Sequence, residues 1–141
     1  MKTFNPKLTW QSVKNMHGED FQYGDSRRHL PLTPAIYRWI LKNRQGNIKE
    51  IYIGETATLR NRISRHTIVD PRGRREHFDE WRETRGRAIY LETLEIKPFQ
   101  INNRHYSARS LRDEYKRQLI ESIMLYKALD QGYKIRNKGY E

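Results

Sequence analysis

An arginine and a histidine share the apolar stripe of a short predicted helix that follows a glycine-ended strand. The helix spans about residues 58 to 68, and its positions i, i+3, i+4 and i+7 are Leu59, Arg62, Ile63 and His66. Burying a guanidinium costs several kcal/mol unless an anionic or well hydrogen-bonded partner meets it. A phosphate group would be such a partner. The alternative is that Arg62 lays its stem on the core and keeps its charged head in water.

Two tripeptides upstream of this helix favour the phosphate. They are Ala35-Ile36-Tyr37 and Tyr52-Ile53-Gly54. Together they resemble the paired signature of the GIY-YIG nuclease superfamily. In that family an arginine lies ten positions after the tyrosine of the second motif and a histidine or tyrosine lies four further on. Arg62 and His66 occupy these two positions. The resemblance covers about residues 34 to 137 and implies a small stand-alone endonuclease.

The resemblance implies hydrolysis of phosphodiester bonds with a divalent metal, Mg2+ or Mn2+, held by one glutamate on the last long helix. The family's glutamate follows an aliphatic residue and precedes an aliphatic pair by three to four positions. Residues 120–125 fit that pattern, so the resemblance assigns the metal to Glu121. Glu114 lies two turns earlier without the pattern and is the other candidate. Without the resemblance, both would be solvated carboxylates that pair with Arg117 or Lys127.

The resemblance also implies roles for the other side chains. Tyr37 would orient and deprotonate the attacking water and Tyr52 would steer a phosphate oxygen, although the reverse assignment stays open. A free phenol has a pKa of about 10, so a tyrosine base needs a nearby cation, a metal-bound water or His66 to act near neutral pH. Arg62 would neutralise the phosphate through its planar fork of donors. Further contacts to phosphate or DNA are predicted at Arg60, Arg65 and Asn137.

Three positions depart from the family pattern. Ala35 stands where the first motif has glycine, and Glu55 follows the second motif where many relatives carry lysine, which removes one activating cation. The family often has a proline and an asparagine about a dozen residues after the metal-binding glutamate. Here Asn137 lies sixteen residues after Glu121, and no proline precedes it.

These side chains would be positioned by an α+β domain in which helices flank a three-stranded antiparallel sheet. The expected order is strand, strand, helix, helix, strand, helix, and the resemblance implies the same fold. Apolar residues on both faces and a polar turn indicate a hairpin of the first two strands. The expected strands cover residues 35–42, 49–54 and 88–96, and the helices about 58–68, 74–85 and 107–130.

The two ends of the chain carry weaker patterns. Residues 1–33 are predicted to be an irregular or partly helical arm, with a short helix over Leu8 to Met16, ahead of a nuclease domain at 34–141. A structural role for this arm is favoured over a DNA-contacting or dimer-forming one. The last helix is expected to bury an apolar stripe at spacings of four, four, four and three. The stripe consists of Leu111, Tyr115, Leu119, Ile123 and Tyr126.

Composition restricts the classes of function. The chain has 141 residues and a formal net charge of +11, which favours a polyanionic partner. Nucleic acid, with double-stranded DNA expected, is the first candidate, and an anionic membrane surface is the second. It has no cysteine, so disulfides and thiolate metal sites are excluded. It has neither an apolar run long enough to span a membrane nor a signal peptide, which predicts a soluble cytoplasmic protein.

Two functions follow from these observations. The first is a metal-dependent DNA endonuclease, a phosphodiester hydrolase with a Tyr, Arg, His and Glu active site. The second is a non-catalytic basic nucleic-acid-binding module that retains the nuclease fold. A chain of this charge binds DNA with strong salt dependence in either case, so binding alone does not separate them. Two cuts by one active site per chain would require a homodimer or a larger assembly.

Overall fold

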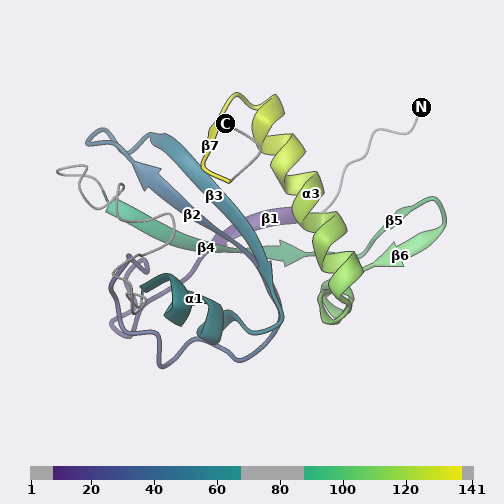
Figure 1. Cartoon of the computed structure of the whole chain (residues 1–141), viewed down its shortest axis with the longest axis horizontal. Coiled ribbons are helices and arrows are strands. Elements are labelled where there is room, and N and C mark those ends of the chain that lie inside the picture. The colour runs from purple at the N-terminus through teal and green to yellow at the C-terminus, as the bar shows by residue number, and fades with distance from the viewer. Residues whose placement is uncertain (1–7, 68–87, 138–141) are drawn as a thin grey trace.

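The central element of the structure is a five-stranded mixed sheet, with α1 (Leu59–Thr67) on one face and α3 (Glu114–Asp130) on the other (Figure 1). The computed structural model describes residues 8–67 and 88–137 and, in these ranges, every side chain except those of residues 65–67 and 88. The strand order is β1-β4-β2-β3-β7, and the β3–β7 pair is parallel. In that order the strands are Leu8–Ser12, Ala88–Ile96, Ala35–Lys42, Ile48–Thr56 and Lys134–Ile135.

The predicted α+β class is confirmed, but the predicted three-stranded antiparallel sheet is wrong in its extent. The three expected strands are present as β2, β3 and β4, with β2 antiparallel between the other two. Strand β1 is added outside β4, and β7 is added outside β3. A two-residue strand such as β7 is too short to carry any alternation of its own. The predicted helix over 74–85 lies outside the described residues.

The N-terminal segment contributes to the sheet and to the core. The predicted short helix at Leu8 is wrong, because β1 pairs antiparallel with β4 over its whole length. Leu8 and Trp10 contact the core while Thr9 is exposed, so the short segment follows the period of a strand. Further along, Leu30 is buried against the α1 side of the sheet. The boundary at residue 33 between arm and domain stays a prediction.

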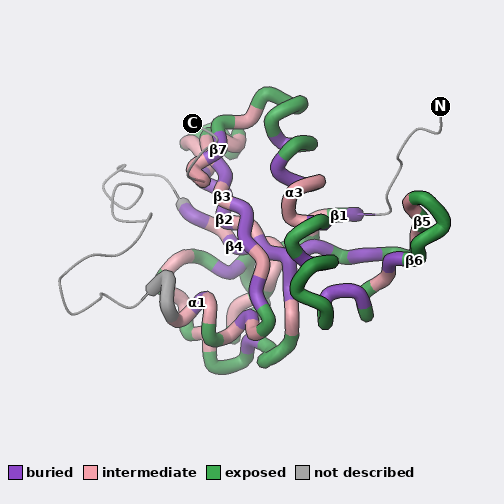
Figure 2. Tube along the Cα trace, turned by 45° about the vertical axis from the view of Figure 1, so that its right-hand side comes forward, coloured by how far each residue is buried: buried purple, intermediate pink, exposed green. Residues whose placement is uncertain are grey.

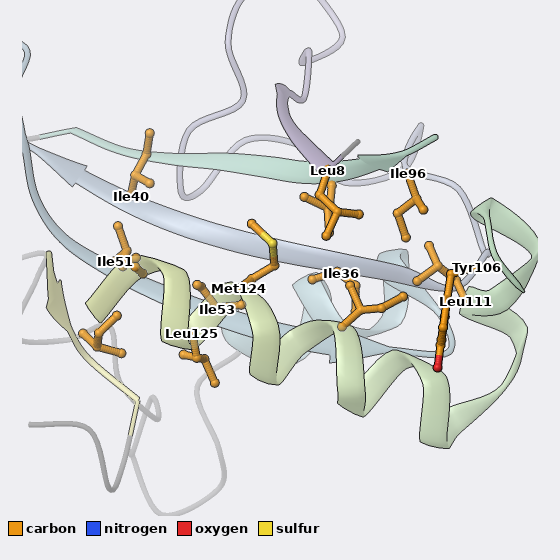
Figure 3. Packing of buried hydrophobic residues seen from close by; sticks show 14 residues of the cluster. Leu8, Ile36, Ile40, Ile51, Ile53, Ile96, Tyr106, Leu111, Met124 and Leu125 are labelled. Atoms are coloured by element: carbon orange, nitrogen blue, oxygen red, sulfur yellow. The ribbon is translucent and has the colours of Figure 1, made fainter. Parts of the chain in front are cut away.

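Most residues of β2 are buried (Figure 2). The period-two alternation of this strand divides the core into two layers. Ile36 and Ile40 face α3, where they pack with Met124 and other aliphatic side chains (Figure 3). Tyr37 and Trp39 face the other way, toward the residues that α1 buries. The two helices that carry the predicted site residues are therefore separated by the sheet.

Two elements interrupt the path from β4 to α3. Strands β5 (Phe99–Ile101) and β6 (Arg104–Tyr106) form a hairpin, joined by two asparagines with φ of 48° and 66°. Such positive φ values are typical of a tight two-residue hairpin loop. A 3-10 helix, η1 (Ala108–Arg112), then precedes α3. The predicted start of the long helix at 107 is wrong, because the Asp113 side chain accepts a hydrogen bond from the Lys116 amide at 3.1 Å and caps α3 there.

The predicted buried stripe of the last helix is confirmed only in part: Leu111 is buried and Ile123 packs against the core, but the other three members are exposed. Tyr115 is 82% exposed and Tyr126 is 69% exposed, and the helix buries a neighbouring face instead. That face contains Arg117, Ile120, Met124, Leu125 and Ala128. The sequence offers both stripes, and the one actually buried includes an arginine. Periodicity favours the all-apolar stripe because it cannot show that Arg117 has a partner on another element.

Candidate active site at the edge of the central hairpin

Tyr37 crosses the β2–β3 hairpin over a glycine. Tyr37 is paired with Gly54 in the antiparallel register and is fully buried. A Cβ added at Gly54 would lie 2.5 Å from Cζ and 2.9 Å from Cε1 of Tyr37, and would also meet its hydroxyl. Real Cβ atoms do not approach other atoms so closely. The glycine of the second motif therefore creates the space that the tyrosine of the first motif fills.

Arg62 of α1 reaches the Tyr37 hydroxyl. Its guanidinium donates a hydrogen bond to that oxygen, and the ring of Tyr52 lies with its centroid 6.4 Å from the centroid of Tyr37. Leu59 and Ile63 of α1 are buried in the layer between the helix and the sheet. They hold the helix so that the inward Arg62 meets the Tyr37 hydroxyl, which supplies a partner for a guanidinium removed from water.

The pKa of Tyr37 lies well above the ordinary value for a tyrosine. Burial is the main cause, and the neighbouring Tyr52 raises the pKa further. The charge and the hydrogen bond of Arg62 lower it, while the charge of Glu121 raises it. The hydroxyl is therefore protonated near neutral pH. It can accept a hydrogen bond from Arg62 and still donate one of its own.

Glu121 of α3 lies against the outer edge of β3, near Tyr37 and Arg62. The backbone of Ile53 is paired outward with the Asn137 side chain, whose Oδ1 accepts from the Ile53 amide at 2.9 Å and whose Nδ2 donates to the Ile53 carbonyl at 2.6 Å. Alternate residues of a strand direct their backbone groups to the same side, so the Glu55 amide also points outward. This amide donates to the Glu121 carboxylate. Glu121 thus reaches the site from the opposite face of the sheet.

The pKa of Glu121 is raised from 4.5 to about 7. Burial is the largest cause, and the negative charge of Glu55 adds to it. The Glu55 amide and the positive charge of Arg62 act in the opposite direction. Glu121 is therefore a carboxylate that would be stabilised in its ionised form by an additional cation.

A buried ion pair that the sequence did not indicate supports this edge. Arg117 Nε donates to the Glu55 carboxylate at 2.7 Å, and Arg117 Nη1 donates to the Leu111 carbonyl at 2.9 Å. The pair fixes α3 to the end of β3 one turn before Glu121. Two signals were available: Glu55 stands where many proteins of the family that the sequence resembles carry lysine, and Arg117 lies four positions before Glu121. Neither signal identifies the partner.

Four of the five predicted catalytic side chains therefore share one electrostatic environment: Tyr37, Tyr52, Arg62 and Glu121. The side chain of the fifth, His66, lies outside the described residues, as does that of Arg65. Glu114, the alternative metal ligand, is exposed and lies 3.5 Å from the Gln118 amide nitrogen. It takes no part in this cluster.

The remaining predicted contacts lie elsewhere. Arg60 Nε donates to the Leu30 carbonyl at 2.6 Å, on another side of α1 from Arg62. Both polar atoms of the Asn137 amide bond the backbone of Ile53, where they continue the short β7 pairing. In this structure Asn137 therefore holds the C-terminal segment against β3.

A metal ion at this site would have one nearby carboxylate of raised pKa, that of Glu121. In the described part of the chain, no group of three or more His, Cys, Asp and Glu side chains could enclose a metal. Among the residues that the structure describes, Glu121 is the one carboxylate whose raised pKa indicates that it would gain from a cation. Mg2+ binds through one or two carboxylates while it keeps several waters, so a single glutamate fits this ion.

Models of known protein families, curated proteins and solved structures give no match to this chain.

Proposed function

We propose that this protein is a divalent-metal-dependent DNA endonuclease of the GIY-YIG type. The observation that carries the proposal is the meeting of Arg62 and Glu121 at Tyr37, although the two residues come from helices on opposite faces of the sheet. A guanidinium, two phenols and a carboxylate that could hold a metal can together supply the activated water and the charge stabilisation that phosphodiester hydrolysis requires. A packing role for each residue alone would not require this meeting.

Each side chain has a role in the proposed reaction. Arg62 would bind the scissile phosphate and stabilise the charge that develops on its oxygens. Tyr37 would orient the attacking water through its hydroxyl, and Tyr52 would hold a phosphate oxygen. Glu121 would hold Mg2+ or Mn2+, which supplies Lewis-acid stabilisation of the phosphate and a more acidic bound water. The described chain provides the scaffold for all four groups.

The use of Tyr37 as a base requires that its proton be lost. Burial and the charge of Glu121 oppose ionisation of this phenol, whereas Arg62 favours it. Neutralising the Glu121 charge would remove one of the opposing effects. His66, one turn beyond Arg62 on α1, is proposed as the group that takes the proton or fixes a tyrosine hydroxyl.

DNA as the substrate is supported by the charge of the chain. The net charge is +11, and no helix in the described residues is long and apolar enough to cross a membrane. Double-stranded DNA, an intracellular location and a homodimer or higher assembly for double-strand cuts are parts of this proposal.

The experiment is digestion of a supercoiled plasmid with Mg2+, with Mn2+ and with EDTA. We expect nicked or linear products with either metal and none with the chelator. DNA binding without any cutting in either metal would favour the alternative, a non-catalytic binding module that keeps the nuclease fold.

A further inference from the structure

A cleft rich in arginine lies on the side of α1 away from Arg62. It has a volume of about 570 Å³, and two segments form it, the loop before β2 and the first turns of α1. The lining side chains are Ser26, Arg27, Arg28, Arg60 and Ser64. Three guanidiniums and two hydroxyls face one space, and no carboxylate is among the described residues that line it.

Hydrogen bonds hold two of these arginines in place. Arg27 Nε donates to the Ser64 hydroxyl at 2.7 Å, and Arg60 Nε donates to the Leu30 carbonyl at 2.6 Å. Both residues are half-buried. Each of these bonds uses one of the five N–H donors of a guanidinium, so the terminal nitrogens keep donors for a ligand. An arginine held by its Nε loses less entropy when it binds.

The loop itself is fixed to the start of α1. The Arg60 amide donates to the Pro31 carbonyl at 3.1 Å, and the Leu59 amide donates to the Thr33 carbonyl at 3.0 Å. Leu30 is 1% exposed and packs in the same core layer as Leu59. The cleft is therefore a preformed feature of the fold.

Gathered positive charge is unfavourable without an anion, since like charges in one cleft repel each other. The planar fork of arginine suits phosphate, and the Ser26 hydroxyl can add a further donor, whereas the Ser64 hydroxyl already donates its proton to the Arg60 carbonyl at 2.9 Å. The volume exceeds what one phosphate needs and lies in the range of pockets that hold larger ligands. The chemistry therefore favours a phosphodiester chain over a single free anion.

The position of the cleft relative to Arg62 indicates which phosphates of the DNA would bind there. Arg60 and Ser64 share one face of α1, whereas Arg62 lies two residues from each, about 200° around the helix axis. We propose that this cleft binds backbone phosphates of the DNA strand that flank the scissile phosphate, so that the strand crosses α1. This inference rests on the proposed function in one respect, which is that the bound strand is the one that carries the scissile phosphate.

The test measures binding to a labelled DNA duplex by fluorescence anisotropy, in EDTA so that no cutting occurs. The variant Arg27→Gln/Arg28→Gln is compared with Arg44→Gln/Arg104→Gln, which removes the same charge at two exposed positions away from the cleft, one in the β2–β3 turn and one at the start of β6. Circular dichroism reports whether each variant folds. Arg28→Gln alone serves if the double variant does not, because Arg28 is exposed.

We expect the cleft variant to bind the duplex about tenfold or more weakly than the unaltered protein. The slope of log Kobs, the observed binding constant, against the logarithm of the salt concentration should become about one to two units shallower. The control pair should change the affinity by less than about threefold. Equal losses of affinity in the two variants would refute the proposal that the cleft binds DNA, but they would not contradict the proposed nuclease activity. If the unaltered protein does not bind DNA, both proposals fail.

Discussion

Tyr37 lies directly opposite Gly54 across the β2–β3 hairpin, and its ring occupies the space where a side chain at position 54 would be. The same tyrosine is hydrogen-bonded by Arg62 and is within the electrostatic range of Glu121. The position of this one ring therefore links the core of the sheet to the groups proposed for catalysis.

Replacing Gly54 by alanine should damage both stability and cutting. The new Cβ would collide with a ring that is fully buried, so the ring or β3 must shift. We expect a loss of about 1–3 kcal/mol in the free energy of unfolding, measured by urea denaturation. Gly46→Ala is the control, because that glycine has open space around it and a φ of +82°. It should lose about 1 kcal/mol from backbone strain and still cut DNA. A Gly54→Ala protein that is as stable and as active as the unaltered one would contradict the packing described.

Arg62→Lys should separate a phosphate clamp from a general positive charge. Lysine keeps the charge but lacks the fork that meets both the Tyr37 hydroxyl and a phosphate. We expect the single-turnover cutting rate to fall by about 10²-fold or more. Affinity for the same duplex should change by less than about threefold, because the phosphate charge is still neutralised. If lysine supports the unaltered rate, Arg62 acts through charge alone.

The raised pKa of Glu121 predicts a pH dependence of stability without metal. The folded protein keeps this proton where the unfolded chain has lost it, so the contribution to stability is full below about pH 4.5 and is lost as the pH rises to about 7. Glu121→Gln removes this loss. In EDTA, the stability of Glu121→Gln relative to the unaltered protein should rise by about 1–2 kcal/mol from pH 4.5 to neutrality, a value reduced for partial solvent access. A difference that stays constant over this range would refute the raised pKa.

The ion pair between Arg117 and Glu55 should contribute mainly to the placement of α3. Arg117→Met leaves the Glu55 carboxylate mostly buried without its partner, which should cost about 2–4 kcal/mol in urea denaturation. Adding Glu55→Leu should restore at least half of that loss, because the unpaired charge is then gone. Additive losses in the double variant would show that the two side chains act independently.

The sequence predicts the parts of this fold that local patterns determine. The β2–β3 hairpin, β4 and α1 follow from alternation, turn residues and a helical stripe within a few residues of one another. Tyr37, Arg62 and Glu121 could be selected because a family resemblance supplied their spacing. Without it, the unusual features were the inward positions of Arg62 and His66 on the predicted helix.

The features that the sequence did not predict depend on distant partners. Arg117 belongs to the buried face of α3 because Glu55, 62 residues earlier, neutralises it. Asn137 extends the sheet edge by pairing with Ile53, 84 residues earlier. A short window of sequence contains neither partner. Periodicity therefore favoured the stripe that includes Tyr115, and the resemblance assigned Asn137 a contact to DNA.

The most direct test of the account compares Glu121→Gln with Glu114→Gln, two substitutions on the same helix that each remove one carboxylate. Cutting of an end-labelled duplex with Mg2+ is measured beside affinity for that duplex in EDTA. We predict that Glu121→Gln reduces the cutting rate by about 10²-fold or more with unchanged affinity, while Glu114→Gln cuts like the unaltered protein. Normal cutting by Glu121→Gln would contradict the proposal that the Glu121 carboxylate holds the metal.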